Sequence, residues 1–302
     1  MSDEGNQLAN HDHIVQLQSR LVANRHGRRT LLSVPGCWDG LTALMIEKAG
    51  FEAAFVTGSG LSMARLGRPD VSLVTVSELL DAVMAIRDRV SIPVVVDCDT
   101  GFGGILNVQR TVRSMERAGA SAIQIEDQPF PKKCGHMAGK FVVSIRESTG
   151  RIKAALDARS RMLIVARTDA IASEGIGAAL DRADAYLEAG ADLIFVEAPI
   201  KLEDLVAISR RFSNRVPLVH NLVEGGISPT NDGLELENLG FAMALHPLLL
   251  MHGFISAAPR WLAHLREVRG TMGLSATIGG LDDINKLVGL EELQRAADRY
   301  DT

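Results

Sequence analysis

Two kinds of hydrophobic segment alternate along most of the chain. The short apolar runs begin at Leu31, Ala53, Pro93, Ala122, Met162, Leu193, Pro217 and Phe241. Continuous apolar runs of this length are typical of strands buried on both faces of a parallel sheet. The longer segments between them have apolar residues at helical spacing, and they predict helices from Val76, Asn107, Ser144, Ile176 and Lys201. A further helical patch begins at His13.

Glycine marks the end of several predicted helices just before the next apolar run. The pairs are Ala49-Gly50, Ala118-Gly119, Ala189-Gly190 and Leu239-Gly240. Glycine at this position is the usual stop of a helix. Eight strand–helix units in a chain of this length predict an α/β fold, a (β/α)8 TIM barrel. We expect one barrel domain over residues 1–302, with a polar segment at 1–29 and additional C-terminal helices in a tail at 265–302.

A doubly wound parallel sheet is the alternative architecture. It would use fewer strands and would normally place a Gly-rich nucleotide turn after the first strand. The one Gly-rich stretch, residues 101–104, reads GFGG and lacks the GxGxxG spacing. The barrel is therefore the better prediction.

Composition narrows the class of protein. The chain has 302 residues, 46% of them hydrophobic and 23% charged, with a formal net charge of -5 and no run of Lys or Arg. A binder of nucleic acid or of anionic membranes normally carries a basic stripe, so we expect neither partner. The polar, acidic start is unlike a signal peptide, and three cysteines cannot form a disulfide framework. These features predict a cytoplasmic protein.

Polar residues follow nearly every predicted strand. They are Trp38, Asp39, Thr57, Gly58, Ser59, Asp97, Asp99, Glu126, Asp127, Arg167, Asp169, Glu197, Asn221 and Glu224. Catalytic groups of TIM barrels lie on the loops after the strands. Any one of these residues could instead be a loop cap or a salt-bridge partner, but the whole set predicts one shared site.

Four carboxylates of this set would lie around that site. Asp97, Asp99, Glu126 and Glu197 would repel one another unless a cation neutralised them. Mg2+ binds through one or two carboxylates and keeps several waters, so it is the simplest prediction. Arg167 adds a planar cation that can hold a carboxylate through two hydrogen bonds. Together they indicate a small anionic ligand.

The loop after the fourth strand carries an unusual cysteine. Cys134 lies among Lys132, Lys133 and His136, and positive neighbours of this kind lower the pKa of a thiol. Gly135 and Gly139 would allow the loop to move as a lid. A lone cysteine is often only structural; in this setting we interpret Cys134 as chemical, and Cys37 and Cys98 as packing residues.

These residues carry a resemblance to a known family. The matching stretches are PGCWDGLTA (35–43), VTGSGLSMARLGRPD (56–70), VDCDTGFGG (96–104), IEDQPFPKKCGH (125–136), ARTDA (166–170), VEAP (196–199) and NLVEGGISP (221–229). Over about residues 12–300 the sequence resembles the isocitrate lyase/phosphoenolpyruvate mutase superfamily. The KKCGH segment resembles the corresponding segment of the lyase branch of this superfamily, which includes 2-methylisocitrate and 2,3-dimethylmalate lyases.

The resemblance implies a metal and an assembly. Asp99 would bind Mg2+ directly, with Mn2+ as an alternative ion, and Asp97, Glu126 and Asp70 would act through its waters. The C-terminal helices would be swapped between subunits in a homotetramer, a dimer of dimers.

It also implies roles around a 2-hydroxy acid substrate. Thr57, Gly58 and Ser59 would hold its carboxylate, and Arg167 would contact the oxygen that becomes a ketone. Glu197 and Asn221 would line the far wall of the site. Trp38 occupies the place of an aromatic beside the substrate, and Gly135 completes the substrate-binding set. Cys134 would be the general acid that protonates the carbanion, supported by Lys132 and His136.

One position departs from the pattern. Methylisocitrate lyases carry an Arg after the eighth strand, and the corresponding residue here is His252. A neutral imidazole cannot replace a bidentate guanidinium, which favours a dicarboxylate over a tricarboxylate substrate.

The leading hypothesis is a Mg2+-dependent carbon–carbon lyase that acts on a substituted malate. The alternatives are an oxaloacetate hydrolase or decarboxylase, a carboxyphosphonoenolpyruvate phosphonomutase, and a non-catalytic barrel that binds a metabolite.

Overall fold

Eight parallel strands form a closed barrel in the computed structural model, which describes residues 13–22, 30–132, 139 and 141–300. The strands are β1 (Leu32–Cys37), β2 (Ala54–Val56), β3 (Val94–Asp97), β4 (Ala122–Glu126), β5 (Leu163–Thr168), β6 (Leu193–Val196), β7 (Leu218–Asn221) and β8 (Met243–His246). Each strand pairs with the next, and β8 pairs with β1 from Leu32↔Met243 onward. All eight predicted strands and the TIM-barrel fold class are confirmed.

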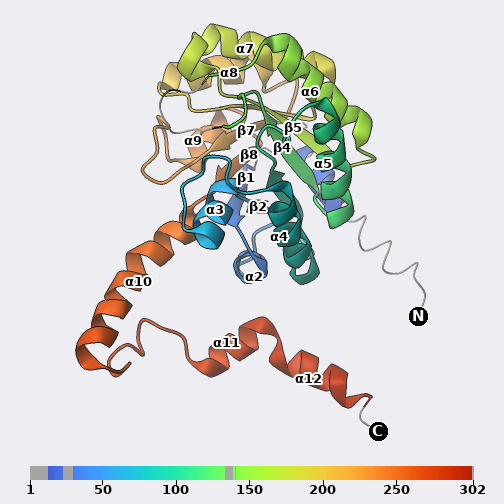
Figure 1. Ribbon diagram of the computed structural model, residues 1–302. Helices are drawn as coiled ribbons and strands as arrows, with labels where there is room; N and C mark the ends of the chain where they lie inside the picture. Colours follow the sequence, from blue (N-terminus) through green and yellow to red (C-terminus); the bar gives the residue numbers. More distant parts are fainter. Residues whose placement is uncertain (1–12, 23–29, 133–138, 140, 301–302) are drawn as a thin grey trace. The chain divides into compact units, whose positions relative to one another are not determined.

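Helices follow the strands and lie around the outside of the barrel (Figure 1). They are α2 (Gly40–Lys48), α3 (Gly58–Leu66), α4 (Val76–Arg89), α5 (Ile105–Ala118), α6 (Ile145–Ala158), α7 (Ile171–Ala189), α8 (Leu202–Phe212) and α9 (Gly233–Asn238). The predicted glycine stops are confirmed: Gly119 and Gly190 end α5 and α7 with φ of 95° and 106°, a left-handed conformation that favours glycine. None of the helices formed by the described residues is both long and apolar enough to cross a bilayer.

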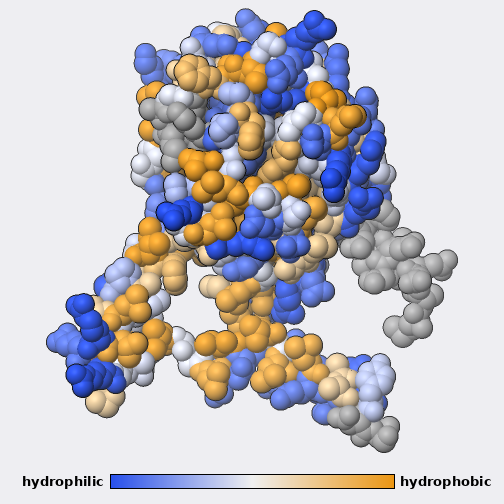
Figure 2. Space-filling view, in the orientation of Figure 1, coloured by the Kyte–Doolittle hydropathy of each residue, from blue (hydrophilic) through white to orange (hydrophobic). Residues whose placement is uncertain are grey.

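The chain divides into two compact units, Met1–Leu249 and Leu250–Thr302. The first contains the barrel. The second contains nearly all of α10 (Leu249–Val268) together with α11 (Leu281–Val288) and α12 (Leu290–Asp298), so it begins well before residue 265. Every residue of α11 and α12 is described and none is buried, and apolar side chains gather along these helices in Figure 2. The predicted swap of these helices between subunits stays a prediction.

The interior of the barrel is filled by one hydrophobic cluster. Successive side chains of a strand point to opposite faces, so the inward positions recur every second residue. Val95, Val165, Phe195 and Val219 belong to the cluster, each from a different strand. The residues two positions later are Asp97, Arg167, Glu197 and Asn221, and they must point into the same interior at its carboxyl end. The alternation that builds the core therefore also aims these polar side chains at one another.

A short helix at residues 13–22 closes the amino end of the barrel. Its Leu17 and Leu21 are buried in the same cluster as Leu32, Leu163 and Leu193, near the starts of three strands. His13 at its beginning makes a 2.8 Å hydrogen bond with the Ser121 hydroxyl, just before β4. This confirms the helical patch that the sequence predicts from His13.

Carboxylates at helix ends fix the loops that lead into the strands. Glu116, near the end of α5, accepts hydrogen bonds from the backbone N–H groups of Ser160, Arg161 and Met162, ahead of β5. Glu47 near the end of α2 does the same for Ser91 and Ile92, ahead of β3. Buried backbone donors need such partners. These contacts hold the amino-end loops in one conformation.

We predict that Leu17→Ala destabilises the barrel by about 2–5 kcal/mol, because it removes a buried side chain and leaves a cavity in the core. Equilibrium unfolding in urea would measure the loss. Leu234→Ala is the matched control, since Leu234 is 69% exposed and its truncation should change stability by less than about 0.5 kcal/mol. Equal effects of the two substitutions would contradict the role of the 13–22 helix.

Candidate active site

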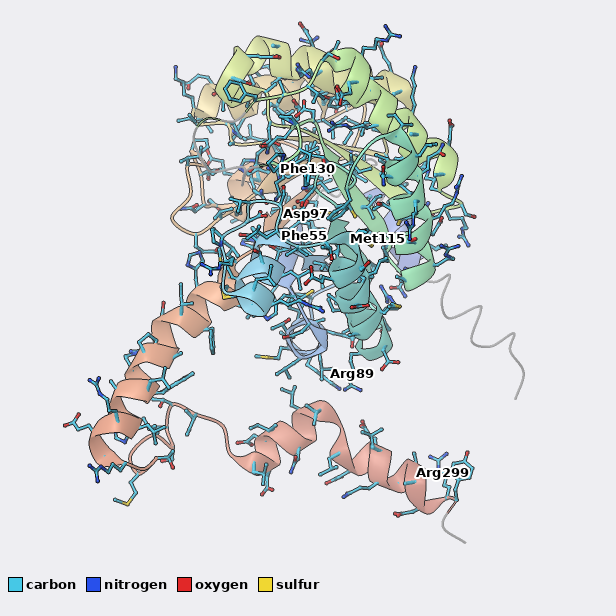
Figure 3. The ribbon with its side chains drawn as sticks, viewed as in Figure 1. Phe55, Arg89, Asp97, Met115, Phe130 and Arg299 are labelled. Carbon is cyan, nitrogen blue, oxygen red and sulfur yellow. The ribbon has the colours of Figure 1, made fainter. Side chains whose placement is uncertain are left out.

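A cavity of about 180 Å3 lies at the carboxyl ends of the strands. Its wall is formed by Phe55, Thr57, Ser59, Met63, Pro69, Asp70, Asp97, Lys132, Arg167, Glu197, Asn221, Val223, Pro247 and Leu248. Phe55 of β2 and Asp97 of β3, both labelled in Figure 3, lie close together at this end of the barrel. Eight of the residues predicted from the sequence line this one cavity: Thr57, Ser59, Asp70, Asp97, Lys132, Arg167, Glu197 and Asn221.

The first turn of α3 forms one side of the cavity. Thr57 is the N-cap, and its hydroxyl accepts a 3.2 Å hydrogen bond from the Gly60 N–H. The N–H groups of a first helical turn lack partners within the helix and favour negative charge. Gly58 permits a close approach here, since a Cβ on it would lie 3.3 Å from an Asp97 oxygen and 3.6 Å from an Asp99 oxygen. The residues predicted to hold a carboxylate therefore adjoin the acidic cluster.

Asp97 and Asp99 lie at the end of β3. Asp97 Oδ1 accepts hydrogen bonds from the Gln124 amide (3.1 Å) and from the Asp99 N–H (3.2 Å). Asp99 has a φ of 48°, in the left-handed region that Asp adopts more readily than most residues. Burial, with the nearby charges of Asp97 and Asp70, raises the pKa of Asp99 to about 7 against the opposing effect of Lys132. Asp99 is thus a buried carboxylate whose negative charge is costly without a cation beside it.

Lys132 lies inside this cluster. Its ammonium nitrogen is 2.7 Å from Asp70 Oδ2 and 2.8 Å from Asp99 Oδ1, and its side chain is buried. Burial works against this charge, but Asp99, Asp97, Glu126 and Asp70 outweigh it and raise the pKa of Lys132 well above its usual value. Lys132 is therefore a fixed cation among carboxylates. Its predicted support of Cys134 stays a prediction, because Cys134 lies outside the described residues.

Arg167 is surrounded by three carboxylates. Its Nε and Nη2 donate hydrogen bonds of 2.9 and 3.1 Å to the two carboxylate oxygens of Asp169, a two-point contact. Glu126 lies 3.3 Å from Nε, and Glu197 lies 3.4 Å from Nη2. Among the described residues these contacts use Nε and Nη2, and Arg167 also lines the cavity. The guanidinium also lies over the Phe195 ring, 5.1 Å from its centre.

Glu197 and Asn221 lie side by side in the cavity wall. The Asn221 amide donates to both oxygens of Glu197, at 3.3 and 3.1 Å. Asn221 Oδ1 is buried and has no hydrogen-bond partner among the described residues. A buried acceptor without a partner is costly, so it fits a ligand that carries a hydroxyl or a water.

The acidic residues fit a hydrated divalent cation. Glu126 Oε1 is buried without a hydrogen-bond partner in the described part of the chain, and burial raises the pKa of Glu126 well above its ordinary value. No three His, Cys, Asp or Glu side chains within the described ranges converge as a metal-ligand group. One direct carboxylate with others acting through water is the coordination typical of Mg2+. Asp99, with Asp97, Glu126 and Asp70 around it, could hold such an ion.

Other predicted residues are not part of the described cavity wall. Cys134, Gly135 and His136 fall outside the described residues, and His252 belongs to the second compact unit. Trp38 is half-buried and contributes nothing to the described cavity wall; a Cβ on Gly60 would lie 3.1 Å from its ring. Asp39 proves to be a cap, since it accepts from the Thr42 N–H at the start of α2.

The two other cysteines are packing residues. Cys37 and Cys98 are fully buried free thiols. Burial raises the pKa of both, so neither is a ready nucleophile. Their burial supports the interpretation of both as packing residues.

The sequence did not indicate Gln124 or the apolar part of the wall. Gln124 supports Asp97, while Asp169, already in the predicted polar set, supports Arg167. Gln124 could have been found, because it is a polar residue at an inward position of an otherwise apolar strand, two residues before Glu126. Met63, Val223 and Leu248 carry no such signal, since only the folded chain brings them to the cavity.

Comparisons with known proteins agree with this geometry. A family model described as phosphoenolpyruvate phosphomutase matches residues 22–262. The chain is 40% identical over 278 residues to 2,3-dimethylmalate lyase of Eubacterium barkeri, which covers 91% of the chain and 95% of that protein. It is 41% identical over 239 residues to 2-methylisocitrate lyase of Bacillus subtilis (strain 168), 78% of each protein.

A solved structure extends the match in three dimensions. Oxaloacetate acetylhydrolase in complex with the inhibitor 3,3-difluorooxalacetate superposes with a TM-score of 0.87 at 29% identity, over 94% of this chain and 96% of that one. Sequence motifs, barrel and family match all agree. The chain belongs to the phosphoenolpyruvate mutase/isocitrate lyase superfamily.

Proposed function

We propose that the protein is a Mg2+-dependent carbon–carbon lyase that cleaves a substituted 2-hydroxy dicarboxylate, of the 2,3-dimethylmalate type, to a 2-oxo acid such as pyruvate and a carboxylic acid. The observation that carries the proposal is the single cavity in which the α3 N-terminus, the acidic cluster and Arg167 meet. The similarity to 2,3-dimethylmalate lyase over nearly the whole chain supports the reaction class.

The α3 N-terminus and Arg167 would fix the substrate. The N–H groups of Gly58 and Ser59 are not used by the Thr57 cap and would receive the carboxylate next to the reacting carbon. Arg167, held from two sides by carboxylates, would present Nη1 to the oxygen that becomes the ketone. A guanidinium that is already oriented loses little entropy when the substrate binds.

The acidic cluster would hold the cation. Mg2+ would be bound directly by Asp99, with Asp97, Glu126 and Asp70 acting through water. Bound there, it would lower the pKa of the substrate hydroxyl and stabilise the negative charge that develops on oxygen. Gln124 keeps Asp97 oriented for this task.

Cys134 would supply the last proton. When the carbon–carbon bond breaks, the leaving fragment carries an enediolate charge that must be protonated on carbon. A thiol flanked in sequence by Lys132 and His136 suits this step, because positive neighbours make its proton easier to release.

The apolar part of the wall favours a dicarboxylate with alkyl substituents. Met63, Val223, Pro247 and Leu248 can cover methyl groups but offer nothing to a third carboxylate. Within the described wall the cations are Lys132 and Arg167, and carboxylates already surround both. The preference for a dicarboxylate agrees with the presence of His252 where methylisocitrate lyases carry an arginine. The similarity to oxaloacetate acetylhydrolase keeps oxaloacetate as the second candidate substrate.

A coupled assay for 2-oxo acid release tests the proposal. The panel is 2-methylisocitrate, isocitrate, 2,3-dimethylmalate, other alkylmalates, oxaloacetate and phosphonopyruvate, each with Mg2+ or with a chelator. We expect Mg2+-dependent release from an alkylmalate and little from the tricarboxylates. Release of oxalate and acetate from oxaloacetate, with silence on every malate, would move the chemistry to the second candidate.

We expect Cys134→Ser to lower kcat by about 10²–10⁴-fold, because a hydroxyl is a much weaker acid than a thiol. Substrate affinity should change little, and single-turnover kinetics would separate the two quantities. Cys37→Ala is the control, as Cys37 is a buried thiol outside the described cavity wall, and it should keep its activity. Unchanged turnover in Cys134→Ser would exclude the acid role.

Asp99→Ala should abolish Mg2+ binding in a calorimetric titration and reduce turnover by at least about 100-fold. Asp88→Ala, an exposed aspartate on α4, provides the matched control and should behave as wild type. Full activity of Asp99→Ala in the presence of a chelator would contradict the metal assignment.

A further inference from the structure

Asp127 is a buried carboxylate that the proposed reaction does not use. It directly follows Glu126, the last residue of β4, and its side chain is 1% exposed. Its Oδ2 accepts hydrogen bonds from the Thr168 hydroxyl (2.7 Å) and the Tyr186 hydroxyl (2.8 Å), and its Oδ1 accepts from the Asp169 N–H (2.9 Å). A carboxylate buried this completely is tolerated only when donors surround it. Asp127 is not part of the described cavity wall.

The donors come from α7 and from the end of β5. Tyr186 and Arg182 are four residues apart and so lie on the same face of α7. Arg182 Nη1 is 3.5 Å from Asp127 Oδ2, and the same nitrogen donates to the Val143 carbonyl at 2.8 Å. The other side of the guanidinium makes two 2.9 Å hydrogen bonds to Glu174.

A kink in α7 makes the last contact geometrically feasible. In a straight helix, residues eight apart are separated by about 12 Å along the axis. Gly175 has φ 83° and ψ 172°, which interrupts α7 directly after Glu174. The kink turns Glu174 back toward Arg182, and the pair then fixes the guanidinium beside Asp127.

Asp169 connects this network to the cavity. Its N–H donates to Asp127, while its carboxylate makes the two-point contact with Arg167. Thr168, the neighbouring residue, is bound to Asp127 as well. The Asp127 carboxylate therefore holds both residues of the turn that carries the partner of Arg167.

We propose that Asp127, held by Tyr186 and Arg182, is a positioning residue that sets the orientation of the Arg167 guanidinium through Asp169. Hydrogen bonds between buried groups are stronger than in water, so the contacts from α7 to Arg167 should restrict how its guanidinium can turn. A role for Arg167 with substrate rests on the proposed function, whereas its positioning rests on the contacts alone.

Tyr186→Phe tests the inference because it removes one donor to Asp127 and keeps the ring. The readout is hydrogen exchange of the Arg167 Nε–H in protein labelled with 15N-arginine, assigned by its loss in Arg167→Lys. We expect exchange about tenfold faster than in wild type, because the guanidinium is released more often. An unchanged exchange rate would overturn the proposal. Thr168→Val removes another donor and replaces Tyr186→Phe if that variant does not fold.

Ser121→Ala is the matched control. It also removes one buried hydroxyl, at the amino end of β4, where the hydroxyl bonds the Val94 N–H and His13. Both variants should show similar losses of thermal stability, but Ser121→Ala should leave Arg167 exchange unchanged. Equal acceleration in both variants would mean general loosening of the barrel and would also overturn the proposal.

A double-mutant cycle carries the test to ligand binding. With Mg2+ and oxalate as the probe, Tyr186→Phe should weaken binding about tenfold in the wild-type background and have no effect in Arg167→Lys, where the two-point contact is already lost. Additive losses would contradict a path through Arg167. If no malate is turned over, the proposed function fails, but the exchange rates and the double-mutant cycle still test the positioning role of Asp127. If the wild-type protein binds no oxalate, the exchange rates alone test that role.

Discussion

The balance of buried charge at the carboxyl end of the barrel is the constraint on which the site depends. Six carboxylates meet there, Asp70, Asp97, Asp99, Glu126, Asp169 and Glu197, while Lys132 and Arg167 are the cations bonded to them among the described residues. Desolvation of so many like charges is costly unless each has a partner. Burial is the largest cause that raises the pKa of Asp99 and of Glu126, and the six carboxylates outnumber the two cations that bond to them among the described residues. A bound divalent cation would reduce this excess of negative charge.

This balance also explains why Arg167 and Lys132 are so firmly held. Each cation is shared by carboxylates from different elements, so each joins strands and loops that are distant in sequence. Lys132 connects Asp70, which follows α3, with Asp99 after β3. Arg167 of β5 connects Glu126 of β4 with Glu197 after β6. The same contacts therefore build the cavity and prepare it for an anionic ligand.

Much of this arrangement was predictable because alternation along a strand is a local property. Once Val95, Val165, Phe195 and Val219 are assigned to the interior, the direction of the polar residues two positions later is fixed. The amphipathic helices and their glycine stops were predictable for the same reason.

Contacts between residues distant in sequence were not predictable in this way. The position of Lys132 between two aspartates depends on how the chain returns after β4. The helix predicted from Ile176 is present, but the turn of α7 that precedes the kink at Gly175 was not predicted. The roles of Cys134, Gly135 and His136 rest on their sequence context and on the resemblance.

The helix at residues 13–22 closes the amino end of the barrel. It lies almost entirely outside residues 22–262, which the family model matches. The end of the molecule that carries out chemistry and the end that seals the core are thus encoded in separate stretches of sequence. A chain shortened past residue 22 would keep every proposed catalytic group but would expose Leu32, Leu163 and Leu193 to water. Loss of this helix should therefore promote proteolysis and aggregation of the protein and leave its substrate specificity unchanged.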